Sequence, residues 1–163
     1  MSREVLFIMT KNKKSGHEVL TLVRFLPYRL SILANRVSAI IADTYRDKFA
    51  LSTTEWRIMA VLGECPRSSA DVVSQKTQIE KSILSRAISK LLHRNLIERE
   101  FDAEDRRRSI LTLTELGQSV YDEIVPISYE YEQRILKCFN TDERRQFSEL
   151  LDRLYQHAEE IDK

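Results

Sequence analysis

The stretch of sequence that decides the fold runs from residue 79 to residue 117 and reads IEKSILSRAISKLLHRNLIEREFDAEDRRRSILTLTELG. Apolar residues recur in its first part at spacings of three and four, which predicts an amphipathic helix over residues 80–93. Asn95 follows, and asparagine tolerates the left-handed conformation in which many helices end. Residues 96–101 read as a strand, and residues 109–114 alternate aliphatic and hydroxyl side chains, so we expect a hairpin with a charged tip.

The predicted helix has two chemically different faces. One face is apolar and consists of Ile83, Leu84, Ala87, Ile88, Leu91 and Leu92. The other is basic and hydroxylic and consists of Lys81, Ser82, Ser85, Arg86, Ser89 and Lys90. A helix fits the major groove of DNA, which is roughly 12 Å wide and in which short polar and basic side chains read base edges. The sequence therefore predicts DNA contacts from Lys81, Ser82, Ser85, Arg86 and Lys90.

The hairpin tip adds three consecutive arginines, Arg106, Arg107 and Arg108. Taken alone, such a run is more often a solvated turn than a binding site. Its position at the tip of a hairpin that follows a basic helix favours DNA contact, because arginine suits the narrow, electronegative minor groove.

Further helices are predicted on both sides of this stretch. Ser52 to Glu55 form a capping-box pattern that opens a helix through Leu62, and Ser68 or Ser69 can cap a short helix. Helical spacing also covers residues 26–45, residues 116–135 with a kink or break at Pro126, and a last helix capped by Asn140 or Thr141. We expect a mainly α fold with a small β-hairpin wing, a winged helix-turn-helix with N- and C-terminal helices that the family resemblance given below assigns to dimerisation. The expected domains are an N-terminal segment with a dimerisation helix (1–50), a DNA-binding lobe (51–115) and C-terminal dimerisation helices (116–163).

Charge and composition support a cytoplasmic DNA-binding protein. The formal net charge is +1, but residues 1–50 carry +5, residues 51–80 carry −1, residues 81–114 carry +3 and residues 115–163 carry −6. The acidic end is therefore not expected to lie against phosphates. No apolar run approaches the roughly 20 residues that span a bilayer, so no membrane partner is expected. Neither a metal-ligand spacing, a phosphate loop nor a nucleophile motif is present, so we expect no cofactor, no metal and no enzymatic activity.

Two sequence patterns resemble the multiple antibiotic resistance regulator (MarR) family. Residues 102–117 carry an Asp-x-Arg pattern followed by an aliphatic strand and Leu-Thr-x-x-Gly, similar to the family's wing, and residues 79–91 resemble its recognition helix. The family commonly has glycine where Asn95 stands here. The resemblance implies that Arg107 inserts into the minor groove and that Asp105 shapes the wing. It also implies a triangular homodimer, joined by terminal helices, with a small-molecule pocket beside the DNA-binding lobe.

Four residues are candidates for contacts with that effector: Tyr28, Arg29, Arg36 and Trp56. Arg29 and Arg36 lie seven residues apart and share a helix face, where either could pair with the carboxylate of an aromatic acid. The sequence favours solvated or interface roles for these arginines and core or interface roles for Tyr28 and Trp56, although Trp56 could have both roles. Whether Cys65 or Cys138 has a redox role stays open, with reduced thiols preferred.

The function predicted from these patterns is sequence-specific binding of double-stranded DNA by a homodimer at a pseudo-palindromic operator. We expect a repressor that a small effector releases. The alternatives are a winged-helix protein-interaction module and a DNA-binding regulator that responds to no ligand.

Overall fold

A computed structural model describes residues 12–14, 17–101 and 109–161, with side chains from Val19 onward. These residues fall into two compact units, one ending at Ile40 and the other beginning at Ile41. The first unit contains the antiparallel strands β1 (Asn12–Lys14) and β2 (His17–Val19), the short 3-10 helix η1 (Leu22–Arg24) and the first part of α1 (Leu26–Phe49). The sequence analysis did not predict the β1–β2 hairpin, because its residues form a polar stretch without strand-like alternation.

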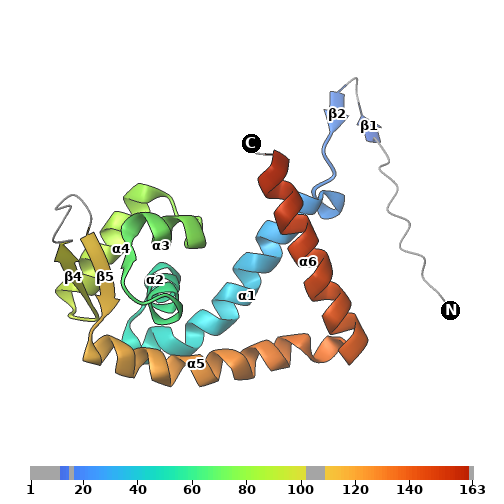
Figure 1. The fold of residues 1–163 in the computed structure, drawn as a ribbon. Coiled ribbons are helices and arrows are strands. Elements are labelled where there is room, and N and C mark those ends of the chain that lie inside the picture. The colour runs from blue at the N-terminus through green and yellow to red at the C-terminus, as the bar shows by residue number, and fades with distance from the viewer. Residues whose placement is uncertain (1–11, 15–16, 102–108, 162–163) are drawn as a thin grey trace. The chain divides into compact units, whose positions relative to one another are not determined.

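The second unit holds the rest of α1 and all later elements, which Figure 1 labels in chain order. These elements are α2 (Thr53–Glu64), β3 (Ser68–Ser69), α3 (Ala70–Thr77), α4 (Lys81–His93), β4 (Ile97–Phe101), β5 (Ser109–Leu113), α5 (Glu115–Ile135), η2 (Leu136–Cys138) and α6 (Thr141–Ile161). The mainly helical fold with a small wing is therefore confirmed.

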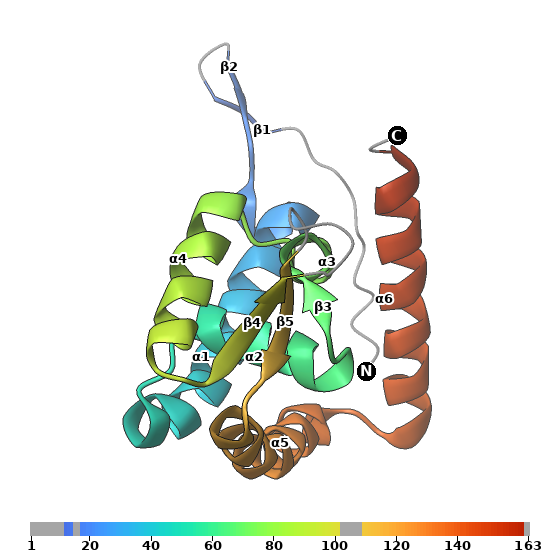
Figure 2. The ribbon, with the colours of Figure 1, turned by 60° about the vertical axis from the view of Figure 1, so that its left-hand side comes forward.

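The sheet has three antiparallel strands in the order β3-β5-β4, which lie side by side in Figure 2. Strands β4 and β5 pair from Ile97 with Leu113 to Phe101 with Ser109, so the predicted hairpin is present. The additional strand β3 pairs Ser68 with Leu111 and Ser69 with Ile110. Two serines are too few to show the alternation of side chains that identifies a strand, so β3 is recognised only by its pairing with β5.

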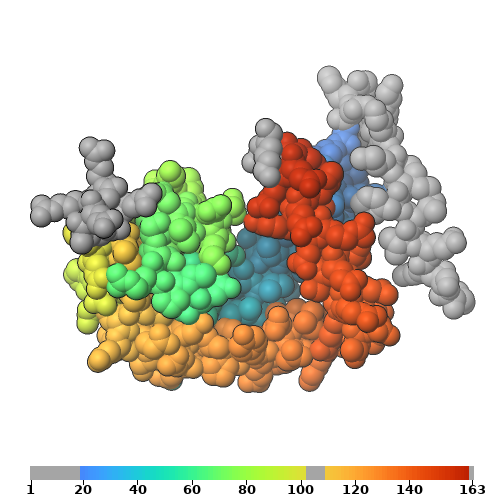
Figure 3. Space-filling view, viewed as in Figure 1, coloured from blue at the N-terminus to red at the C-terminus, as the bar shows by residue number. Residues whose placement is uncertain are grey.

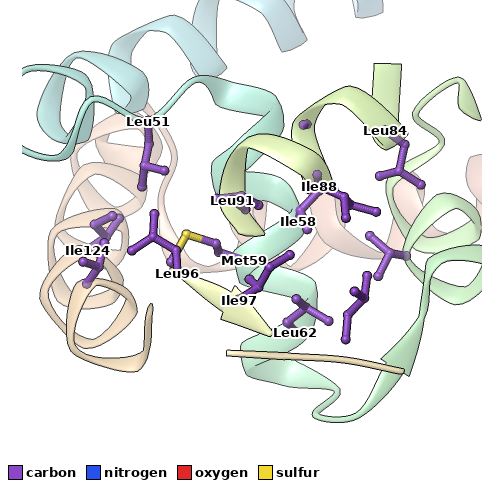
Figure 4. Close-up of a cluster of buried hydrophobic side chains, with 14 of the residues drawn as sticks. Leu51, Ile58, Met59, Leu62, Leu84, Ile88, Leu91, Leu96, Ile97 and Ile124 are labelled. Carbon is purple, nitrogen blue, oxygen red and sulfur yellow. The ribbon is translucent and has the colours of Figure 1, made fainter. Parts of the chain in front are cut away.

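The core of the second unit lies where α2, α4, β4, β5 and α5 meet. Figure 4 shows side chains from these elements converging, among them Ile58 of α2, Leu91 of α4 and Ile97 of β4, each no more than 1% exposed. Gly117 brings the first turn of α5 against the backbone, because a Cβ atom built there would lie 1.8 Å from the carbonyl oxygen of Leu96. The lobe is thus one packed body that fixes α4 relative to the hairpin.

Two local predictions differ from the structure. Helix α5 continues through Pro126 as one helix, so of the predicted kink or break the break does not occur. Ile124, two residues before Pro126 and fully buried, anchors this part of the helix in the core. Ile83 was assigned to the apolar, inward face of α4, but its side chain is 47% exposed. It lies at the edge of the apolar face, one residue away from the row of Leu84, Ala87, Ile88 and Leu91 that packs into the core.

Candidate nucleic-acid interface

The turn between α3 and α4 is built from side chains that close the end of one helix and start the next. Helix α3 ends at Gln78, which has a φ of 54° and donates its backbone N–H to the carbonyl of Ser74. The hydroxyl of Ser74 donates to the carbonyl of Ile79 at 3.2 Å, while Thr77 donates to Val73 at 2.7 Å. These bonds tie side chains at the end of α3 to backbone carbonyls of the helix and of the turn, so the turn is compact.

Helix α4 separates its two faces as the sequence predicts, apart from Ile83. Leu84, Ala87, Ile88 and Leu91 are buried. The five side chains predicted to contact DNA are all exposed: Lys81, Ser82, Ser85, Arg86 and Lys90. Ser89 and His93 extend the same exposed surface toward the end of the helix. A face of this composition, with apolar Ile83 at its edge, can offer donors, acceptors and one methyl-rich contact to a DNA groove.

The first turn of α4 carries a hydrogen-bond network centred on Ser82. Glu80 caps the helix by accepting from the backbone N–H of Ser82 at 3.0 Å, and its second carboxylate oxygen accepts from the Ser82 hydroxyl. Arg86, one turn later, donates its Nε to the Ser82 carbonyl at 3.3 Å and a terminal nitrogen to the Ser82 hydroxyl at 3.4 Å. The hydrogen bonds from Ser82 lower the pKa of Glu80, so the carboxylate is ionised at neutral pH. The sequence analysis did not single out Glu80.

The wing begins and ends in bonds that explain the Leu-Thr-x-x-Gly pattern. Thr114 accepts from the backbone N–H of Gly117 at 3.0 Å and so caps α5, while its hydroxyl donates to the carbonyl of Asn95 at 2.6 Å. Asn95 has a φ of 55°, the left-handed conformation predicted for it. Threonine at this place thus joins the end of the recognition helix to the start of α5, and glycine is needed for the close approach to Leu96. Asp105, Arg106, Arg107 and Arg108 lie outside the described residues.

The other end of α4 is tied to α1. Arg94 donates to the backbone carbonyls of Phe49 and Ala50, the latter at 3.0 Å, where α1 ends. A guanidinium at a helix C-terminus satisfies free carbonyls and opposes the helix dipole. A shift at the C-terminal end of α1 would therefore act directly on α4. Sequence reasoning missed Arg94 because its partners are backbone atoms more than forty residues away.

The residues predicted to bind an effector do not form one described site. Tyr28, Arg29 and Arg36 are exposed on the part of α1 that belongs to the first unit. Trp56 belongs to the second unit, where its ring lies between those of Tyr45 and Tyr121 with centroids 5.8 Å away on each side. This aromatic row joins α1, α2 and α5, so Trp56 has the core role that the sequence favoured for it.

We also searched the part of the chain that the structure describes for metal sites, disulfides and membrane-spanning helices. No group of three or more metal-binding side chains occurs among these residues. Cys65 is partly buried and Cys138 exposed, and both are free thiols. None of the described helices is long and apolar enough to cross a membrane.

A short helix, a tight turn, an exposed polar recognition helix and a two-stranded wing, all on one lobe, define a winged helix-turn-helix protein. The MarR family model matches residues 51–108, which cover the helix-turn-helix and the hairpin. Over these residues the chain is similar to the MarR family of transcription regulators, and the structural likeness described next extends that similarity over most of the chain.

Three relatives illustrate the likeness. The crystal structure of a MarR/EmrR family transcriptional regulator from Acinetobacter sp. ADP1 superposes with a TM-score of 0.79 at 29% identity, covering 86% of this chain and 99% of that one. The HTH-type transcriptional regulator BilQ of Clostridium symbiosum is 27% identical over 57% of this chain, and the match spans 65% of BilQ. BpsR of Bordetella bronchiseptica, whose DNA binding is regulated by 6-hydroxynicotinic acid, shares the fold at 22% identity and a TM-score of 0.66, over 78% of this chain and 98% of BpsR.

Proposed function

We propose that this protein is a MarR-family regulator, a cytoplasmic repressor that binds double-stranded DNA at a pseudo-palindromic operator and has no enzymatic activity. The observation that carries the proposal is the exposed face of α4, on which Lys81, Ser82, Ser85, Arg86 and Lys90 lie together. The buried face of the same helix fixes that surface on the lobe that also carries the hairpin. In this proposal α4 enters the major groove, and Arg106, Arg107 and Arg108 approach the adjacent minor groove, with Asp105 shaping the wing.

The working unit in this proposal is a homodimer. Helix α6 has no buried residue, yet it carries an apolar stripe on one face. The stripe consists of Phe147, Leu150, Leu151, Leu154, Tyr155 and Ile161, all exposed. A contiguous apolar surface of this kind marks an interaction site. Residues 1–50 and 116–163 would join two copies, and the DNA-binding lobe (51–115) of each copy would occupy one half-site.

The proposed signal is a small aromatic acid that releases the repressor. Regulation of BpsR by 6-hydroxynicotinic acid shows that this fold can couple such a ligand to DNA binding. In this chain Arg29 and Arg36 offer exposed guanidinium groups for a carboxylate, and the exposed Tyr28 on the same helix offers a ring. The bonds from Arg94 to the end of α1 give a physical route from that helix to α4. Replacing Arg29 with alanine should leave DNA binding intact and abolish release; unchanged release would remove Arg29 from the pocket.

A salt series on DNA selected from a random pool tests the DNA-binding proposal. Phosphate contacts make log affinity fall linearly with log salt concentration, and Arg107→Ala should reduce that slope by roughly one. Analytical ultracentrifugation of the same complexes should give two chains per operator. A screen of aromatic acids for release of the bound DNA would then test the effector.

The second candidate function is a winged-helix module that binds protein instead of DNA. The exposed Ile83 on the recognition face is the observation that favours it, because DNA-reading faces are mostly polar. A selection that enriches no DNA sequence, together with affinity independent of salt, would support this alternative. A selected operator that is bound equally well with and without every tested acid would instead support a regulator that needs no ligand.

A further inference from the structure

We propose that Glu80 is a specificity-determining positioning residue: it commits the Ser82 hydroxyl to accept hydrogen bonds from DNA and directs Arg86 beside it. The inference rests on the proposed function and specifies which hydrogen-bonding groups of the DNA bases are recognised by the first turn of α4. It starts from the contacts that Glu80, Ser82 and Arg86 make with one another.

The direction of each hydrogen bond follows from a count of protons. An ionised carboxylate has acceptors only, so the proton between Glu80 and the Ser82 hydroxyl belongs to Ser82. A serine hydroxyl has one proton and two acceptor lone pairs. With the proton held by Glu80, Ser82 has only lone pairs left to offer. Arg86 uses one of them, because a guanidinium has donors only.

The place of Glu80 keeps its charge in a favourable position. It is the N-cap of α4, where the helix dipole and the free backbone N–H groups stabilise an anion. The N-terminus of α4 thus stabilises one negative charge beside a face that is otherwise basic. Arg86, held by Ser82 and attracted by the Glu80 charge, is drawn back along the helix toward the first turn. Recognition helices usually touch bases with this turn.

The network therefore presents a donor beside an acceptor. In the major groove guanine shows two acceptors, N7 and O6, which suit an arginine. Cytosine and adenine show an amino group there, which suits a hydroxyl that can only accept. We expect each operator half-site to place a guanine opposite Arg86 and an amino-bearing base, cytosine or adenine, opposite Ser82. A hydroxyl free to rotate would accept or donate and would make no such distinction.

The test is selection of bound sequences from random DNA by the full chain and by four variants. Glu80→Gln keeps the size of the side chain but supplies an amide that donates to Ser82 and frees its proton. Glu80→Asp retains an ionised acceptor. Ser82→Ala identifies the operator position that Ser82 reads. Asp71→Asn is the matched control, since it removes a negative charge 4.0 Å from Lys81 without touching Ser82 or Arg86.

We expect Glu80→Gln to reduce the preference at the position marked by Ser82→Ala by about threefold to tenfold, the value of one hydrogen bond. Its affinity for non-specific DNA should be unchanged or higher, because a negative charge is lost. Glu80→Asp should retain the wild-type preference and Asp71→Asn should leave the profile unchanged. Combining Glu80→Gln with Ser82→Ala should add nothing further at that position, as expected for residues acting through one another.

A purely structural cap would behave differently. If Glu80→Gln lowered the melting temperature and weakened binding to every sequence equally, or left the base profile as in the wild type, the inference would be wrong. In either case the wild type would still select an operator, so the proposed function would stand. If instead the wild type bound no DNA in a salt-dependent manner, both the proposed function and this inference would fail.

Discussion

Helices α4 and α6 are both amphipathic, yet the chain treats their apolar faces in opposite ways. In α4 the side chains of Leu84, Ala87, Ile88 and Leu91 are buried in the core of the lobe, whereas α6 buries none of its residues. In Figure 3 the side chains of α6, drawn in red, lie at the surface of the molecule. Helical spacing of apolar residues therefore predicts that one face of the helix is buried, but it does not identify the surface that buries it. The rest of the lobe buries the apolar face of α4, and we propose that a second copy of the chain buries the apolar face of α6.

The largest expected effect comes from the covered face. Leu91 is fully buried, so Leu91→Ala removes packing and leaves a cavity, which should lower the free energy of unfolding by about 2–5 kcal/mol. Denaturation in urea measures this loss. Ser89→Ala, on the exposed side of the same helix, is the control and should change stability by less than about 0.5 kcal/mol. Equal losses in both variants would mean that α4 is not anchored by its apolar face.

Gly117 tests how closely α5 is docked on the lobe. A Cβ atom at this position meets the carbonyl oxygen of Leu96 at 1.8 Å, and backbone cannot yield as a flexible side chain can. Gly117→Ala should therefore cost about 1–3 kcal/mol of stability, although alanine favours helices. Ser119→Ala, exposed two residues later, should be neutral or slightly stabilising. A more stable Gly117→Ala would show that α5 and the Asn95 turn can separate without cost.

The sequence predicted most of this lobe because its signals are local. The capping box at Ser52 and Glu55, the left-handed Asn95 and the two faces of α4 all follow from short-range rules, and the structure has each of them. What could not be predicted depends on distant partners. Strand β3 forms only because it pairs with β5. The role of Arg94 depends on its hydrogen bonds to backbone carbonyls at the end of α1. Continuity at Pro126 depends on the packing around it. The prediction for Ile83 was wrong because this residue lies at the edge of the apolar face, where the packing of the lobe, not the spacing in the sequence, decides burial.

The exposed face of α4 should matter for binding and not for folding. Arg86→Ala should weaken operator binding by about 1–3 kcal/mol if Arg86 reads a base, while the free energy of unfolding changes by less than about 0.5 kcal/mol. Fluorescence anisotropy with labelled operator gives the first quantity and urea denaturation the second. Lys137→Ala removes an equal charge at an exposed position on η2 and should leave operator affinity unchanged. An Arg86→Ala variant that binds as the wild type does would remove Arg86 from the interface.

The cap of α2 should contribute a smaller amount. Ser52 accepts from the backbone N–H of Glu55 at 3.2 Å, and the Glu55 carboxylate accepts from the backbone N–H of Ser52 at 2.7 Å. Ser52→Ala breaks one half of this box and should lower the free energy of unfolding by about 1 kcal/mol. Ser52→Asp should restore most of it, since aspartate caps equally well. Loss of stability in both variants would point to packing around residue 52 instead of the cap.

The smallest effect on the folded monomer, and the sharpest test of the comparison, is expected on α6. Leu150 is 58% exposed, so Leu150→Ala should change monomer stability by less than about 0.5 kcal/mol, far less than Leu91→Ala. If a second copy covers the stripe, the same substitution should shift the monomer–dimer equilibrium toward monomer in sedimentation experiments, and Asp152→Ala on the polar side of α6 should not. The dimer would then lose concentration-dependent stability, because subunit association stabilises the fold by mass action. Unchanged dimerisation in Leu150→Ala and in a Leu150→Asp variant would mean that α6 is not covered by a second copy.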